Sequence, residues 1–315
     1  MSLGLLIPGQ GTQHAVMLPW LLTHERLHTT TDPTLDRLAA ALGTDWRTRL
    51  NDPRWATRNA VAQPLITGLA LALWARLRAD LPAPAAVAGY SVGEVAAFSI
   101  AGVFDADTAM DLALARAQAM DAAAAQHPAG GLLAVRELAA DALAPVLQRH
   151  GLTIAIRLGP QRHVVGGPAT ALAAAEHELV ADGVSCTRLG VQIASHTPML
   201  AEAVLALAAV VEARTFSLPR TALVCNATGE AVRRPAALRD AFARQVAQTV
   251  PWDRCMEAVA ERGVSCVLEL GPGTTLSKMW NARFPAIAAR SADEFSHPAA
   301  VIDWVRHQIA RAAAQ

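Results

Sequence analysis

At positions 89–93 the sequence reads Gly-Tyr-Ser-Val-Gly, directly after the apolar run 85–88 and before a helical pattern that begins near Glu94. This is G-x-S-x-G in the order strand, turn, helix. The glycines around Ser91 let the backbone turn sharply, so that the serine hydroxyl stands out from the end of the strand. N–H groups at the start of the following helix favour negative charge there. The stretch predicts a serine nucleophile on an α/β fold, although a serine in such a turn can also serve only as a turn or helix cap.

The rest of the chain alternates apolar runs typical of buried strands with longer helical patterns, which favours an α/β architecture. Within residues 129–190 the order becomes strand, helix, strand, strand, helix, strand, which is the ferredoxin-like split βαβ unit. The first kind of alternation then resumes. We therefore expect an α/β-hydrolase-like large subdomain, formed by residues 1–128 and 191–315, with a ferredoxin-like small subdomain inserted at 129–190.

Composition excludes several classes of function. The 315 residues are 53% hydrophobic and 17% charged, which allows a large core and excludes a disordered chain. Basic and acidic residues number 27 each, so no nucleic-acid surface is expected. The four cysteines lack metal-ligand spacing and indicate reduced thiols, with no metal, in a cytoplasmic protein. Residues 3–7 predict a buried strand rather than a secretion signal, and the most apolar stretch, 65–75, is too short to cross a membrane.

A serine hydroxyl needs a base within hydrogen-bond reach before it can act as a nucleophile. Of the ten histidines, His196 stands apart because it lies among small residues, in Ile-Ala-Ser-His-Thr-Pro at 193–198, directly after the inserted segment. It is our candidate base. The alternative is a hydrogen-bonded loop histidine without a chemical role.

Four segments of the chain also carry a likeness to a known family. They are Pro8-Gly9-Gln10-Gly11-Thr12-Gln13, Gly89-Tyr90-Ser91-Val92-Gly93-Glu94, Ser195-His196 and Glu269-Leu270-Gly271-Pro272-Gly273. In this order they resemble the PGQGSQ, GHSxGE, catalytic-histidine and ExGPG segments of the malonyl-CoA:acyl-carrier-protein transacylases and related acyltransferase domains. The resemblance covers nearly the whole chain.

The resemblance implies a Ser–His dyad. Ser91 would attack the malonyl thioester, and His196 would act first as general base and then as general acid. In the family a backbone carbonyl holds the second imidazole nitrogen, and the likeness places that carbonyl at Pro251. The family's oxyanion hole would correspond to the backbone N–H groups of Gln10 and Val92.

Substrate selection is implied by two further positions. The family has an arginine at the position of Arg116 that grips the malonyl carboxylate, a task that suits the forked guanidinium. Gln63 falls at the family's TQP position and would line the same pocket; a polar residue at a helix start is the simpler interpretation. Two positions depart from the family pattern: Tyr90 replaces the usual His, and Leu158 replaces an Asn of the small subdomain.

The leading hypothesis is a ping-pong malonyl transferase that acts from malonyl-CoA onto the phosphopantetheine-type arm of an acyl carrier protein, with no permanently bound cofactor. The GYSVGE form and the PGQGTQH opening resemble the malonate decarboxylase epsilon subunit, so the carrier of that system is the first expected partner. The alternatives are a transacylase of fatty-acid or polyketide synthesis, a serine thioesterase or esterase, and a non-catalytic carrier-docking subunit.

Overall fold

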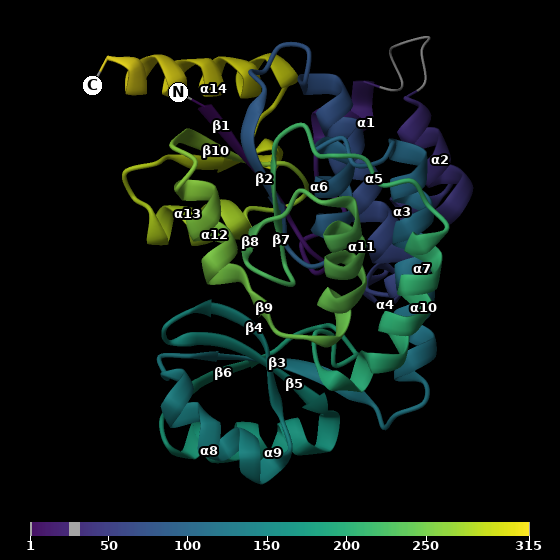
Figure 1. The fold of residues 1–315 in the computed structure, drawn as a ribbon, viewed down its shortest axis with the longest axis vertical. Helices are drawn as coiled ribbons and strands as arrows, with labels where there is room; N and C mark the ends of the chain where they lie inside the picture. Colours follow the sequence, from purple (N-terminus) through teal and green to yellow (C-terminus); the bar gives the residue numbers. More distant parts are fainter. Residues whose placement is uncertain (1, 25–31, 315) are drawn as a thin grey trace.

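The computed structural model describes residues 2–24 and 32–314, and these form two lobes that each contain one sheet (Figure 1). The large lobe has a six-stranded sheet in the order β11-β10-β1-β2-β7-β8. Its strands are β1 (Ser2–Ile7), β2 (Pro84–Gly89), β7 (Ala222–Cys225), β8 (Glu230–Ala231), β10 (Val264–Glu269) and β11 (Ala289–Ser291). All its pairs are parallel except β7 with β8. The mixed α/β class expected from the sequence is confirmed.

The large sheet is buried between helices. Strand β1 is apolar and almost fully buried, as expected for a central parallel strand. Helix α5 (Asn59–Leu77) packs beside α6 (Gly93–Ile100) and α7 (Ala106–Ala124). By length and composition α5 is the one helix of the described residues that could cross a membrane, yet most of it is buried within the lobe. Such burial is typical of a central core helix.

The small lobe follows the expected order β-α-β-β-α-β. Its elements are β3 (Gly130–Arg136), α8 (Ala140–His150), β4 (Thr153–Gly159), β5 (Arg162–Pro168), α9 (Ala169–Ala181) and β6 (Ser185–Arg188). Helices α8 and α9 cover the face of the sheet that points away from the large lobe (Figure 1). A fifth strand, β9 (Val250–Pro251), comes from beyond the inserted segment and pairs in parallel with β4.

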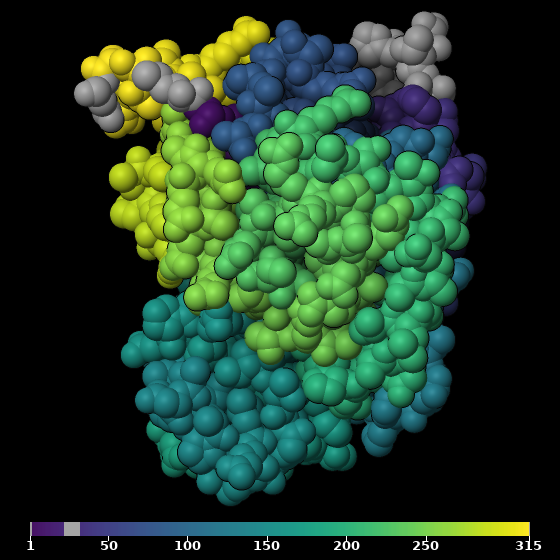
Figure 2. Space-filling model, in the orientation of Figure 1, coloured from purple at the N-terminus to yellow at the C-terminus, as the bar shows by residue number. Residues whose placement is uncertain are grey.

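The remaining helices surround the large sheet and the junction between the lobes. They are α1 (Pro19–His24), α2 (Pro33–Leu42), α3 (Trp46–Arg49), α4 (Pro53–Ala56), α10 (Ala201–Glu212), α11 (Pro235–Arg244), α12 (Trp252–Ala260), α13 (Thr275–Arg283), α14 (Pro298–Ala313), and the 3₁₀ turns Pro198–Leu200, Gln245–Ala247 and Ala292–Glu294. Figure 2 shows the small lobe in teal as a distinct body beneath the rest.

The sheet order explains why distant motifs meet. Strands β10, β1, β2 and β7 are neighbours and run parallel, so their carboxyl ends lie at one edge of the sheet. Open α/β sheets bind ligands outside this edge. The Gly-Pro-Gly turn follows β10, the Pro-Gly-Gln-Gly loop follows β1, the Ser91 turn follows β2, and Asn226 follows β7. The fold therefore collects these loops above one edge, facing the small lobe.

Candidate active site

Ser91 occupies a sharp turn between β2 and α6. Its φ is +53°, in the left-handed region that side chains other than glycine seldom adopt. The flanking glycines make the turn possible, since a Cβ on Gly89 would lie 2.1 Å from the carbonyl carbon of Gly93, and one on Gly93 would lie 2.3 Å from the oxygen of Ile7. This strand–turn–helix geometry is that of a nucleophile elbow.

His196 reaches the serine from the segment that follows the small lobe. Its Nε2 lies 2.8 Å from Ser91 Oγ, and its Nδ1 lies 2.6 Å from the backbone oxygen of Gln245. A carbonyl can only accept, so Nδ1 carries the proton and Nε2 is free to accept from the serine hydroxyl. Burial, aided by the charge of Arg116, lowers the pKa of His196 to about 3. The imidazole is therefore neutral at neutral pH and is prepared to act as a base.

The position predicted for the carbonyl that orients the histidine is wrong. The partner of Nδ1 is the backbone oxygen of Gln245, at the start of the 3₁₀ turn after α11. The backbone N–H of His196 donates to the oxygen of Val246, the residue after Gln245. Pro251 instead lies in β9 and pairs with Arg157 of β4 in the small sheet. At Pro251 the chain has therefore moved away from His196 and into the small sheet.

Arg116 and Gln63 are also at this site. Arg116, on α7, is 1% exposed, and its Nη1 donates to Gln63 Oε1 at 2.8 Å. Its Nη2 lies 3.3 Å from Ser91 Oγ. With the Gln245 amide turned so that its oxygen faces the guanidinium, this oxygen accepts from Nε at 3.0 Å and from Nη2 at 3.1 Å. Within the described ranges no carboxylate forms an ion pair with Arg116.

The guanidinium of Arg116 has only neutral hydrogen-bond partners, and the Coulombic attraction of Glu94 offsets only part of the effect of its burial. Burial lowers the pKa of Arg116 to about 10, so the group still carries its charge at neutral pH. A buried charge is costly unless an opposite charge or full hydrogen bonding compensates it. Nη2 lies beside Ser91 Oγ, and a guanidinium can donate two parallel hydrogen bonds to a carboxylate. The site is therefore suited to an acyl group that carries a free carboxylate.

The two expected oxyanion-hole residues lie in the loops after β2 and β1. Val92 follows Ser91 and is the N-cap of α6, and Gln10 lies in the loop after β1, with its Nε2 donating to the oxygen of Thr57 at 2.7 Å. Gly9 lets this loop lie against the elbow, because a Cβ there would be 2.7 Å from the oxygen of Tyr90. Their role toward a developing oxyanion stays a prediction.

A cavity of about 520 Å³ opens beside these residues, between the lobes. Gln10 and Tyr90 line it from the large lobe, and Arg136 and Leu158 line it from the small lobe. Both departures from the family pattern, Tyr90 and Leu158, thus lie on its wall. Tyr90 packs edge-on against Trp252, with ring centroids 5.0 Å apart, and makes that part of the wall aromatic.

Sequence reasoning missed three residues at the site: Asn226, Glu94 and Gln245. Asn226 Oδ1 accepts from the Ser91 N–H at 2.8 Å, and its Nδ2 donates to the oxygen of Gly89 at 2.6 Å. The backbone N–H of Asn226 in turn donates to Glu94 Oε1 at 2.6 Å, and burial raises the pKa of Glu94 to about 8. Glu94 was visible as the last residue of the GYSVGE segment, whereas no local pattern marks Asn226.

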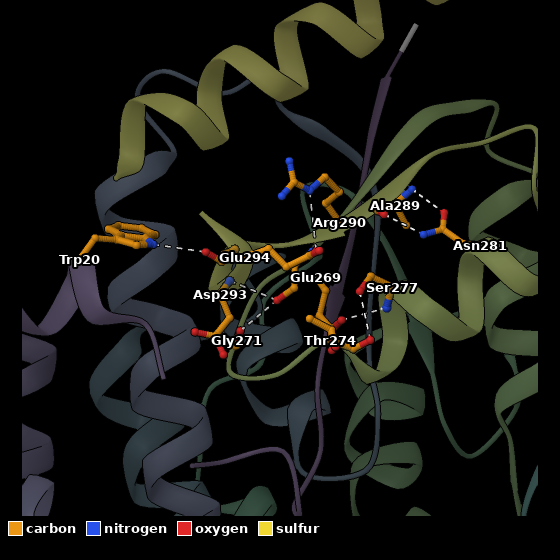
Figure 3. Close-up of polar contacts among 12 residues, drawn as sticks. Trp20, Glu269, Gly271, Thr274, Ser277, Asn281, Ala289, Arg290, Asp293 and Glu294 are labelled. Atoms are coloured by element: carbon orange, nitrogen blue, oxygen red, sulfur yellow. Dashed lines mark hydrogen bonds and ion pairs between the residues drawn. The ribbon is translucent and has the colours of Figure 1, made fainter. Parts of the chain in front are cut away.

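Two carboxylates hold the segment after β10, one at the Gly-Pro-Gly turn and one at the start of α13 (Figure 3). Glu269 is fully buried and accepts from the N–H groups of Leu276 and Ser277, at 3.1 and 2.8 Å, in the first turn of α13. Asp293 accepts from the N–H of Gly273 at 2.7 Å, and also from that of Leu18. These bonds fix α13 and the turn beside the cavity.

Comparison with known proteins places the chain among acyltransferases. The model of the acyl transferase domain family matches residues 5–303. The malonyl CoA-acyl carrier protein transacylase of Mycobacterium bovis is 34% identical over 92% of this chain and 95% of its own length. A phenolphthiocerol synthesis polyketide synthase of Mycobacterium marinum is 31% identical over 86% of this chain, which corresponds to 13% of that longer protein.

Solved structures agree. The malonyl-CoA:acyl carrier protein transacylase of Xanthomonas oryzae superposes with a TM-score of 0.86 at 28% identity, covering 96% of this chain and 98% of that one. The corresponding enzyme of Mycobacterium tuberculosis gives 0.82 at 32% identity, covering 96% and 99%. A malonyl-transacylase in complex with a type II polyketide acyl-carrier protein gives 0.83 at 25% identity, covering 93% and 96%.

Proposed function

The chain belongs to the malonyl-CoA:acyl carrier protein transacylase family, and from this premise we propose that it moves a malonyl group from malonyl-CoA to the thiol of an acyl carrier protein through an ester on Ser91. One observation carries the proposal. The oxygen of Ser91 lies 2.8 Å from a neutral imidazole nitrogen and 3.3 Å from a buried, unpaired guanidinium. The nucleophile, the base and the group that reads a carboxylate therefore meet at one atom.

The first half-reaction forms the ester. His196 Nε2 takes the hydroxyl proton while Ser91 Oγ bonds the thioester carbon, and the carbonyl oxygen becomes an oxyanion beside the N–H groups of Gln10 and Val92. When the oxyanion collapses, the C–S bond breaks and the imidazolium returns its proton to the departing sulfur of CoA. Gln245 accepts from Nδ1 throughout, so the ring keeps its orientation.

The second half-reaction reverses these steps with a new thiol. The carrier's thiol gives its proton to His196 as its sulfur bonds the ester carbon, and the Ser91 oxygen then leaves with that proton. Because a thioester is both consumed and formed, the transfer needs no external energy source. The kinetics are expected to be ping-pong.

The relatives of the chain also bear on which carrier protein receives the malonyl group. The relatives reported above are transacylases and polyketide synthases, and one transacylase is seen with a polyketide acyl-carrier protein. This favours fatty-acid or polyketide synthesis over the carrier of malonate decarboxylase. Transfer from the malonyl-enzyme to a phosphopantetheine-bearing carrier should exceed transfer to a carrier that bears a dephospho-CoA-type group. The opposite preference would restore the malonate decarboxylase hypothesis.

The test of the chemistry uses radiolabelled malonyl-CoA. The native protein should acquire one base-labile label, which Ser91→Ala abolishes, and should pass it to a holo acyl carrier protein. A thioesterase would instead release malonate to water faster than to the carrier, and a non-catalytic docking subunit would remain unlabelled. Either result would refute the proposal.

A further inference from the structure

Two arginines face each other at the mouth of the cavity. Arg136 at the end of β3 and Arg162 at the start of β5 are directly opposite in the antiparallel ladder, and both are exposed and line the cavity. Like charges placed directly opposite on a sheet destabilise it. Neither side chain has an ion-pair partner among the residues that the structure describes, although Glu137 is adjacent in sequence.

A third cation faces the same cavity from the large lobe. Lys278, the only lysine of the chain, lies on α13, is exposed, and makes no ion pair with any described residue. Neighbouring arginines behave differently. Arg157 pairs with Asp253 at 2.8 Å, and Arg283 pairs with Glu257. In a chain of zero net charge, the three cations that line this cavity are thus left without carboxylates, whereas Arg157 and Arg283 each have one.

We propose that Arg136, Arg162 and Lys278 form a phosphate-binding site at the mouth of the active-site cavity, and that it holds the phosphate of the substrate's pantetheine arm. The inference rests on the proposed function, because both thiol carriers of that reaction, CoA and the holo carrier protein, bear a phosphate at the far end of the same arm. A phosphate between the two arginines would turn a repulsive pair into two charge-assisted hydrogen bonds.

The position of the site supports this role. The same cavity is lined by Tyr90, which is next to Ser91 in the sequence. A pantetheine arm that leaves Ser91 past Tyr90 would therefore pass the three cations. Because two of the cations belong to the small lobe and one to the large lobe, the phosphate would bridge the lobes.

The first experiment compares two donors, malonyl-CoA and malonyl-N-acetylcysteamine, which lacks the phosphate. In Arg136→Ala/Arg162→Ala the ratio of kcat/KM for malonyl-CoA to that for malonyl-N-acetylcysteamine should fall about tenfold or more, as expected for lost charge-assisted contacts. Lys278→Ala should lower the ratio less. Arg262→Ala, which removes an exposed, unpaired arginine away from the cavity, should leave the ratio unchanged. An unchanged ratio in the double variant would overturn the proposal.

A second variant separates binding from folding. Arg162→Glu should raise the melting temperature slightly, because it replaces a repulsive cross-strand pair with an attractive one. The same change should lower the donor ratio further than alanine does, because it repels phosphate. A lower donor ratio together with a lower melting temperature would indicate general damage to the small lobe and would contradict the assigned site.

The two half-reactions identify which phosphate is bound. Formation of malonyl-Ser91 from malonyl-CoA tests the CoA phosphate, and discharge to a holo carrier protein, measured against discharge to N-acetylcysteamine, tests the phosphate of the carrier. We expect both to weaken, whereas a loss in only one assigns the site to that source alone. Failure of the proposed function would look different, since the native protein would then form no malonyl-enzyme with either donor.

Discussion

The residue with the largest consequence for selectivity is Arg116. Its guanidinium is buried, charged and without an ion-pair partner in the described chain, so an acyl group lacking a carboxylate leaves that charge with only the partial Coulombic compensation of Glu94. We expect Arg116→Ala to lower kcat/KM for malonyl-CoA about 100-fold and to improve acetyl transfer relative to malonyl transfer. Arg116→Lys should recover little, because an ammonium cannot bind a carboxylate through a fork. An unchanged malonyl-to-acetyl ratio would show that selectivity resides elsewhere.

Asn226 acts on the nucleophile through the backbone. Its amide oxygen accepts from the N–H of Ser91 and its amide nitrogen donates to the oxygen of Gly89, and so it holds the first half of the strained elbow. Asn226→Ala should lower kcat by about 10- to 100-fold through misplacement of Oγ, with KM nearly unchanged. Asn226→Asp keeps an acceptor for the Ser91 N–H and should recover part of kcat. A role confined to stability would lower the melting temperature in both variants without this separation of kcat from KM.

At the scale of single residues, the sequence predicted the local geometry correctly where a motif has only one physical explanation. The glycines around Ser91 are required by close backbone contacts, and such contacts leave a short, readable motif. Gln245 acts through its backbone carbonyl, and Asn226 acts from a loop after β7 by accepting from the Ser91 N–H. Neither residue has a local sequence signature. A carbonyl can be supplied by any residue type, which is why the prediction of Pro251 was wrong.

At the scale of elements, the prediction was best for helices and strands with strong apolar periodicity. The sequence pattern predicts helices over residues 169–181, 201–212 and 107–125. Helices α9 and α10 have the first two ranges, and α7 differs from the third by one residue at each end. Helices α2, α13 and α14 are not predicted by the sequence pattern. Helix α13 is polar, and its first turn donates to the buried carboxylate of Glu269 at the end of the preceding strand, β10. Apolar periodicity, on which the helix predictions relied, gives no sign of such a contact.

Glu269 makes the stability of this region depend on pH. Burial raises the pKa of Glu269 to about 7, above its ordinary value of 4.5, so between these values the folded protein holds a proton that the unfolded chain releases. The free energy of unfolding contributed by this group is therefore full at low pH and falls as pH rises toward 7. Glu269→Gln retains an acceptor oxygen and cannot ionise. Its stability relative to the native protein should improve by about 2–3 kcal/mol between pH 4.5 and pH 8, measured by denaturant unfolding. Parallel pH profiles for the two proteins would contradict this assignment.

At the scale of the whole molecule, the two lobes share structure that should make them unfold in one cooperative transition. Strand β9 belongs in sequence to the large lobe but pairs with β4 of the small lobe, and Thr249 Oγ1 donates to the oxygen of Ile154 at 2.6 Å. One apolar cluster contains Ile156 and Val164 of the small sheet together with Trp252 and Leu6 of the large lobe. Because the inner face of the small sheet shares its core with the large lobe, the lobes are expected to unfold in a single transition.

Adjacent valines on β5 provide a matched test of this expectation. Val164 lies in the cluster shared by the lobes, whereas Val165 lies in the separate core under α8 and α9, and both are at most 2% exposed. Each valine-to-alanine change should cost about 2 kcal/mol. If the lobes are one cooperative unit, both variants lower the same single calorimetric transition by similar amounts. If the small lobe were independent, Val165→Ala would split off an early transition that involves only part of the unfolding enthalpy, while the remainder stayed at the native temperature. We expect the first outcome, since an independently unfolding small lobe would expose the apolar face it shares with the large lobe.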